Sequence, residues 1–155
     1  MKIHIIAVGD RMPEWVETGY KEYAKRLPSH CHLVLHEIPA GRRTKNVDIP
    51  RLTEQEGTRQ LAAIPAGARV IALDLTGKQL GTEALAVELE KQLGSGSDLA
   101  LLVGGPEGLA PACLKRATER WALSRLTLAH PVVRVVLAEQ LYRAWSIINN
   151  LPYHR

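Results

Sequence analysis

The sequence predicts an α/β fold, a mostly parallel sheet flanked by helices. Short β-rich runs alternate with helical patterns along the chain, as expected when helices connect parallel strands. The runs at 69–75 and 98–103 are almost continuously apolar, which is typical of strands buried on both faces. Because the chain has 155 residues and 46% hydrophobic residues, it can bury one core, and we expect residues 1–155 to form a single domain.

The first half of the chain predicts two strands and two helices. Residues 3–8 form a β-rich run closed by Gly9-Asp10, and a helical pattern then opens at Met12-Pro13-Glu14 and runs through Arg26. Pro28 ends that helix, and residues 32–39 are typical of a second strand. A polar, basic loop at 40–50 leads to a second helix at 51–64.

The second half continues the alternation. The strand at 69–75 follows the breaker Pro65-Ala66-Gly67, and Thr76-Gly77-Lys78 is expected to form a turn. A third helix is predicted from about Thr82, ahead of the strand at 98–103. The resulting order is β-α-β-α-β-α-β, so ligands are expected beyond the carboxyl ends of these strands.

A glycine-rich loop, residues 104–108 with the sequence GGPEG, follows the last of these strands. Its spacing is not GxGxxG and no Gly-Lys-Ser/Thr follows it, which disfavours a dinucleotide or a triphosphate. Adjacent glycines let a flat ligand lie against the backbone, whose peptide groups can pair with an adenine edge. Taken alone, the loop is better explained as a tight turn with a helix cap than as a ligand site.

Composition sets further expectations. The formal net charge of +4 is compatible with an RNA partner, and also with proteins that bind no nucleic acid. Cys31 and Cys113 lie far apart without metal-ligand spacing, so we expect reduced thiols and no metal. The amino terminus is typical of a strand rather than a signal peptide, and no stretch approaches the ~20 apolar residues of a membrane span. We therefore expect a cytoplasmic protein with no membrane partner.

The carboxyl-terminal third has a semi-apolar segment too short for a helix, then Ala129-His130-Pro131, then an amphipathic helix from about Val132 to Ile148. Three stretches closely resemble the SPOUT methyltransferase superfamily: VGGPEG at 103–108, LSRLTLAHPVVRVVLAEQLYRAWSI at 123–147 and PYHR at 152–155. The resemblance covers the whole chain, including AVGDRMPEWVETGY at 7–20 and EIPAGRRTKN at 37–46. It narrows to the family of 23S rRNA pseudouridine N3-methyltransferases.

This resemblance implies an α/β sheet with a carboxyl-terminal trefoil knot, assembled as a homodimer. It implies methyl transfer from S-adenosylmethionine to N3 of a pseudouridine in a stem-loop of 23S rRNA, on assembled ribosomes. The glycine loop would then make room for the cofactor. Transferred residue by residue, the implied cofactor contacts are Leu73, Gly104, Gly105, Leu123, Ser124, Arg125, Leu126, Thr127 and Leu128.

The carboxyl-terminal tail supplies the expected catalytic residues. The N3–H of pseudouridine is weakly acidic, so a base or an anion-stabilising cation would make the nitrogen nucleophilic. We expect His154 and Arg155 to fill these roles and Tyr153 to stack on the base or hydrogen-bond to it. The resemblance implies that the tail completes the active site across the dimer. Without it, a terminal Tyr-His-Arg would be expected to be a solvated, frayed end.

RNA contacts are expected from basic side chains near the loops. The candidates are Arg42, Arg43, Lys45, His130 and Arg134, with Lys115, Arg116 and Arg120 as further cations. Each has a plainer alternative: His130 can close the loop ahead of the helix, and the arginines can be surface cations or ion-pair partners. The chain has no phenylalanine and no aromatic-rich RNA-binding signature, which favours a preassembled ribosomal surface over free RNA.

Two other functions stay open on the sequence. A ribose 2′-O-methyltransferase of RNA would keep the cofactor site and change the acceptor atom. A non-catalytic ribosome-binding protein would keep the fold and use the glycine loop only to turn the chain. Analysis of the modified nucleoside separates the first from base methylation, and absence of S-adenosylmethionine binding would identify the second.

Overall fold

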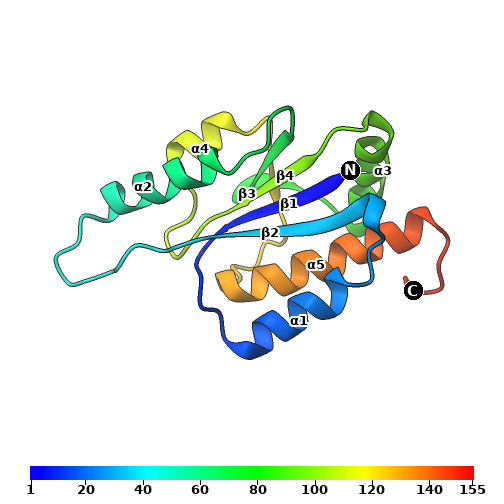
Figure 1. Cartoon of the computed structure of the whole chain (residues 1–155), viewed down its shortest axis with the longest axis horizontal. Coiled ribbons are helices and arrows are strands. Elements are labelled where there is room, and N and C mark those ends of the chain that lie inside the picture. The colour runs from blue at the N-terminus through cyan, green and yellow to red at the C-terminus, as the bar shows by residue number, and fades with distance from the viewer.

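Five parallel strands form one sheet in the order β2-β1-β4-β3-β5 in the computed structural model, which describes residues 1–155 (Figure 1). The strands are β1 (Lys2–Val8), β2 (His32–Ile38), β3 (Arg69–Gln79), β4 (Leu99–Val103) and β5 (Glu119–Ala122). The helices are α1 (Glu14–Ala24), α2 (Ile49–Ala62), α3 (Thr82–Ser95), α4 (Pro111–Arg116) and α5 (His130–Ile148), with a short 3-10 helix at Ser29–Cys31. The parallel α/β sheet flanked by helices is therefore confirmed.

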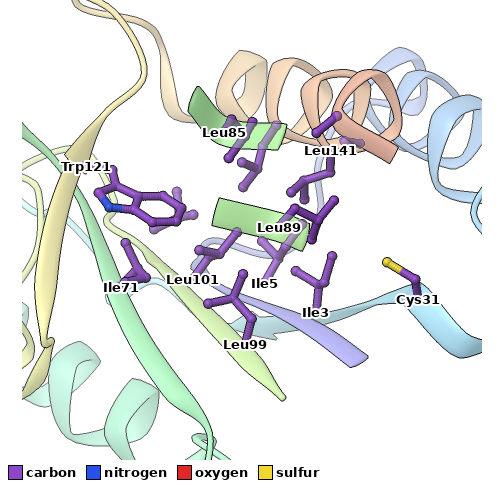
Figure 2. Close-up of a cluster of buried hydrophobic side chains, with 14 of the residues drawn as sticks. Ile3, Ile5, Cys31, Ile71, Leu85, Leu89, Leu99, Leu101, Trp121 and Leu141 are labelled. Atoms are coloured by element: carbon purple, nitrogen blue, oxygen red, sulfur yellow. The ribbon is translucent and has the colours of Figure 1, made fainter. Parts of the chain in front are cut away.

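The sheet separates two apolar layers because successive side chains of a strand point to opposite faces. Ile5 of β1 and Leu101 of β4 are register partners and pack with Leu85 and Leu89 of α3 and Leu141 of α5. Figure 2 shows these side chains converging between the sheet and the two helices. Side chains that point to the other face of the sheet, such as Ile6, Val70 and Leu102, pack towards α4 and the carboxyl end of α2.

The helices cover the sheet on both sides. Helix α5 packs between α1 and α3 on one face, and α2 packs with α4 on the other (Figure 1). Helix α2 has an aspartate as its N-cap, a residue type that favours helix starts. The Asp48 side chain accepts a hydrogen bond of 3.2 Å from the Arg51 backbone N–H. No helix combines the length and apolar character needed to cross a bilayer.

Two sequence predictions about this region were wrong. The segment Thr76-Gly77-Lys78 does not form a turn that ends the strand, because β3 continues to Gln79. The pairing with β5 shifts register here, so that Leu73 and Lys78 both lie opposite Trp121. A Cβ on Gly77 would lie 2.6 Å from the carbonyl carbon of Arg120, so glycine permits this close approach of the two backbones. The second error is β5 itself, which was not predicted as a strand.

Candidate functional site

A cleft of about 600 Å³ opens at the carboxyl end of β4, beside the point where β3 stops pairing with β4, and at the amino end of α5. Its position is the one at which parallel α/β sheets bind ligands. Its walls come from three segments that are distant in sequence: the middle of β3, the glycine loop after β4, and the segment between β5 and α5. The lining residues are Leu73, Asp74, Leu75, Val103, Gly104, Gly105, Pro106, Glu107, Gly108, Ala122, Leu123, Ser124, Leu126, Thr127, Leu128, Ala129, His130 and Val133.

Eight of the nine residues expected to contact the cofactor line this cleft; the exception is Arg125. Arg125 is exposed, and its Nε donates a hydrogen bond of 3.2 Å to the side-chain oxygen of Gln79. The fold therefore gathers strand β3, the glycine loop and residues 123–128 into one site, and it directs the Arg125 side chain elsewhere.

The glycine loop, which lines the cleft, is closed by a hydrogen bond between two of its own residues. The Gly108 N–H donates a hydrogen bond of 3.0 Å to the Gly105 carbonyl, and Gly108 has φ of +83°. A Cβ on Gly104 would lie 2.4 Å from the carbonyl carbon of Gly108, so only glycine fits there. The shape of this wall depends on backbone packed against backbone, which leaves the ligand side free of side-chain atoms at position 104.

Two carboxylates and one imidazole give the cleft its polar character. The Asp74 carboxylate accepts hydrogen bonds from the backbone N–H and the hydroxyl of Thr76. Glu107 forms an ion pair of 2.7 Å with Arg43, and this hydrogen bond lowers the pKa of Glu107. Burial, followed by the positive charges of Arg134 and Arg43, lowers the pKa of His130, which favours the neutral imidazole. The buried Nδ1 of His130 has no hydrogen-bond partner within the chain.

The basic loop at 40–50 divides into free and paired cations. Arg42 and Lys45 are exposed and form no ion pair, so both are available to an anionic partner. Arg43 instead points inward and contacts two carboxylates, those of Glu56 on α2 and Glu107 on the glycine loop. The structure thus places Arg43 between the loops and not on an open basic surface.

Arg134 lies inside the protein, which corrects the expectation that it contacts RNA. Its side chain is only 2% exposed and forms an ion pair of 2.7 Å with Glu37. The other terminal nitrogen donates to the Gly9 carbonyl. Both terminal nitrogens of the guanidinium are hydrogen-bonded, and the Arg134 side chain has no surface open to a phosphate. Arg134 instead links α5 to the ends of β1 and β2.

The tail does not reach the cleft of its own chain. His154 lies between Arg143 and Glu83, at 3.3 Å from each, and the Tyr153 hydroxyl donates to Glu139. These contacts hold the tail at the carboxyl end of α5, whereas His130 at the opposite end of the same helix lines the cleft (Figure 1). Arg155 is exposed and unpaired. The expected catalytic residues and cofactor residues are therefore two separate groups in one chain.

The remaining basic candidates, Lys115, Arg116 and Arg120, are exposed on α4 and β5 and do not line the cleft. No group of three or more His, Cys, Asp or Glu side chains is placed to hold a metal ion.

The sequence places Asp74 and Leu75 at the end of the apolar run 69–75, where a parallel strand is expected to bind ligands, but not among the implied cofactor contacts. Both line the cleft, as does Val133, which the sequence does not indicate. Glu107 belongs to the glycine loop, and its partner Arg43 lies 64 residues away. No local pattern indicates that pairing.

Comparisons with known proteins show the family to which the chain belongs. A family model described as "Predicted SPOUT methyltransferase" matches residues 1–154. The chain is 54% identical over 155 residues to Ribosomal RNA large subunit methyltransferase H of Methylococcus capsulatus, and the alignment covers 100% of both chains. Among solved structures, it is similar in fold to the Legionella pneumophila protein Lpg2936, solved in complex with the bound cofactor SAM. That likeness has a TM-score of 0.51 at 10% identity and covers 93% of this chain and 66% of that one. The chain therefore belongs to the SPOUT methyltransferase family and, within it, to the family of Ribosomal RNA large subunit methyltransferase H.

Proposed function

We propose that the protein transfers a methyl group from S-adenosylmethionine to N3 of a pseudouridine in 23S rRNA, on assembled ribosomes in the cytoplasm. The observation that carries this proposal is the cleft that gathers Leu73, the glycine loop and residues 123–128 at the carboxyl edge of the sheet. The 54% identical relative is named as an rRNA methyltransferase, which supports RNA as the substrate class. The proposal also includes a single-domain chain with a carboxyl-terminal trefoil knot that acts as a homodimer.

The residues of the cleft fit this cofactor. A volume of about 600 Å³ lies within the range of roughly 300–1,000 Å³ usual for small-molecule sites. The loop backbone at Gly104 and Gly105 can approach a flat adenine ring closely. The carboxylate of Asp74 suits a ligand that carries a sulfonium and an ammonium group. The unpartnered Nδ1 of His130 leaves one further polar atom for the ligand or the acceptor base.

When bound, S-adenosylmethionine supplies an electrophilic methyl group on its sulfonium. The residues that line the cleft would hold the cofactor with its methyl group in line with the N3 acceptor, so that N3 takes the methyl group as the sulfur leaves. The N3 proton has to leave, and His154 is our candidate base for it. Arg155 would stabilise the developing anion on the base, and Tyr153 would hold the base by stacking or by a hydrogen bond.

The tail that performs these steps comes, in this proposal, from a second copy of the chain. The 19 residues of α5 separate the cleft from the tail by about 28 Å at 1.5 Å per residue. A tail held at that distance cannot act on a ligand in its own cleft. A homodimer that places the tail of one protomer beside the cleft of the other would complete the site.

The first test combines calorimetric titration with S-adenosylmethionine and a tritiated-methyl transfer assay on ribosomes that lack the native modification. We expect binding by the wild-type protein and transfer to 23S rRNA, with the label recovered on the base and not on the ribose. His154→Ala should abolish transfer and leave cofactor affinity intact. Binding without transfer would retain the cofactor site and refute this substrate, and no binding would refute the methyltransferase.

A mixing experiment tests the shared active site. Gly104→Ala should inactivate the cleft, and His154→Ala should inactivate the tail, so each variant alone should be inactive. Equal mixtures of the two, after unfolding and refolding together, should recover roughly a quarter of the wild-type sites, because only mixed dimers contain an intact cleft beside an intact tail. No recovery would show that cleft and tail act within one chain.

A further inference from the structure

Arg43 occupies the junction of three segments. Its two terminal nitrogens reach the carboxylate of Glu56 on α2, at 2.5 and 3.0 Å. One of them also donates to Glu107 on the glycine loop at 2.7 Å, and the other to the Gly41 carbonyl at 2.9 Å. A single guanidinium therefore fastens the basic loop, a helix and the glycine loop to one another.

On the side away from the cleft, Arg43 is held by the buried carboxylate of Glu56. The Glu56 side chain is only 3% exposed, and its Oε2 also accepts a hydrogen bond of 2.9 Å from the Gly41 backbone N–H. The Arg43 side chain is 22% exposed, and hydrogen bonds with Glu56 and then Glu107 raise its pKa. Because a guanidinium fork fits carboxylates in a fixed plane, the position of Glu56 determines where Arg43 can hold Glu107.

The contact between Arg43 and Glu107 supports the glycine loop on the side that faces away from the cleft. A Cβ on Gly105 would lie 3.7 Å from the terminal nitrogen of Arg43 that binds Glu107, so the guanidinium lies against the outer side of the loop. Gly105 and Glu107 both line the cleft on the other side. Apart from the Gly105–Gly108 closure, the hydrogen bond from Arg43 to Glu107 is the only side-chain hydrogen bond that reaches the five loop residues from another segment.

We infer that Arg43 is a positioning residue for the cofactor site: its ion pair with Glu107 holds the glycine loop in the conformation that binds S-adenosylmethionine. This role replaces the RNA contact expected from the sequence, and it rests on the proposed function. The neighbouring Arg42 and Lys45 stay exposed. One short loop thus presents cations to the RNA and supports the cofactor cleft through Arg43.

The test uses Arg43→Lys and Glu107→Gln, singly and together, in the full-length protein. A lysine keeps a positive charge for the buried Glu56 but cannot hold two carboxylates in one plane. We expect each single variant to raise the Kd for S-adenosylmethionine about tenfold, equivalent to ~1.4 kcal/mol. The double variant should be hardly weaker than either single one, because both changes remove the same contact. In turnover, KM for the cofactor should rise while KM for ribosomes stays unchanged.

Arg51→Lys is the matched control, since Arg51 is exposed on α2 and its side chain forms no ion pair; its Kd should equal that of the wild type. Arg42→Gln should instead raise KM for ribosomes and leave the cofactor Kd unchanged. If Arg43→Lys behaves like Arg42→Gln, Arg43 is an RNA contact and the inference is overturned. Additive effects in the double variant would also overturn it, because Arg43 and Glu107 would then act separately.

Amide hydrogen exchange of the free protein separates this inference from the proposed function. Arg43→Lys should accelerate exchange in residues 104–108 several-fold, without a change in the central strands β1 and β4. Unchanged exchange would overturn the inference whatever the protein binds. Accelerated exchange together with a wild-type protein that does not bind S-adenosylmethionine would refute the proposed function and, with it, the cofactor role of Arg43.

Discussion

The hydroxyl of Tyr153 donates a hydrogen bond of 2.8 Å to Glu139, a residue 14 positions earlier in the chain. Glu139 also receives the guanidinium of Arg143 at 2.9 Å, and the Tyr153 ring packs edge-on against Tyr142 with centroids 4.8 Å apart. A terminal Tyr-His-Arg would by default be frayed, and here these contacts order it against α5. The tail is therefore ordered at the end of α5, where it can contact a neighbouring molecule.

Tyr153→Phe tests how much the hydrogen bond to Glu139 contributes. Burial, together with the hydrogen bond to Glu139, raises the pKa of Tyr153 to about 12, so the phenol is a protonated donor at neutral pH. Removal of the hydroxyl should lower the free energy of unfolding by about 1 kcal/mol in urea titration. The Kd for S-adenosylmethionine should stay the same, because the cleft lies at the other end of α5. Tyr142→Phe, which removes a hydroxyl without a hydrogen-bond partner, is the control. A changed cofactor Kd for Tyr153→Phe alone would show that Tyr153 takes part in cofactor binding, in its own cleft or in that of a partner protomer.

Gly104→Ala should distort the glycine loop and thereby disrupt the cofactor cleft. The added Cβ would meet the Gly108 carbonyl carbon at 2.4 Å and the Leu109 nitrogen at 2.7 Å, and backbone atoms cannot rotate away as a side chain can. We expect a loss of about 2 kcal/mol in unfolding free energy and no detectable cofactor binding by calorimetry. Gly94→Ala is the matched control, since nothing lies within 4 Å of its Cβ position in α3. It should be neutral or stabilise the protein by up to ~1 kcal/mol, and equal effects of the two changes would disprove the close approach at Gly104.

Arg134→Met should destabilise the fold. The change keeps an unbranched side chain in a site that is 2% exposed, and it leaves Glu37 and the Gly9 carbonyl without their donor. We expect a loss of about 3 kcal/mol in unfolding free energy, measured in urea. Glu37→Gln should cost less, because Glu37 is 36% exposed and a glutamine oxygen can still accept from Arg134. A fully stable Arg134→Met protein with weakened ribosome binding would restore Arg134 as an RNA contact.

The ion pair between Glu107 and Arg43 should give stability a defined pH dependence. The hydrogen bond from Arg43 lowers the folded-state pKa of Glu107 below its usual value of 4.5. A depressed carboxylate pKa contributes stability that is fully present above the unfolded-state value and is lost as pH falls through the folded-state value. The difference in unfolding free energy between the wild type and Glu107→Gln should therefore be constant near neutral pH and shrink below about pH 4.5. A difference that stays constant down to about pH 3 would show that the pair does not stabilise the folded state.

Much of the fold followed from local patterns. The apolar runs at 69–75 and 98–103 predicted buried parallel strands, and breakers such as Pro28 and Pro65 indicated where helices and strands alternate. These features are local because strand and helix periodicity depend on neighbouring residues. The missed strand β5 has only four residues, too few for a periodic signal. The misjudged turn at Thr76–Lys78 depends on the register between β3 and β5, which is a property of two segments and not of one.

The sequence by itself determined the sheet, its alternation with helices, and, through its resemblance to a family, the residues that meet at the cleft. Only the tertiary structure decided how the charged side chains are used. Arg42, Arg43 and Arg134 are chemically alike in the sequence, yet one is exposed, one bridges two carboxylates, and one is buried against Glu37. The physical reason is that a charge is buried only where an opposite charge from another segment compensates its lost hydration. Glu56 and Glu107 lie 13 and 64 residues from Arg43, and Glu37 lies 97 residues from Arg134. Only folding brings these partners together.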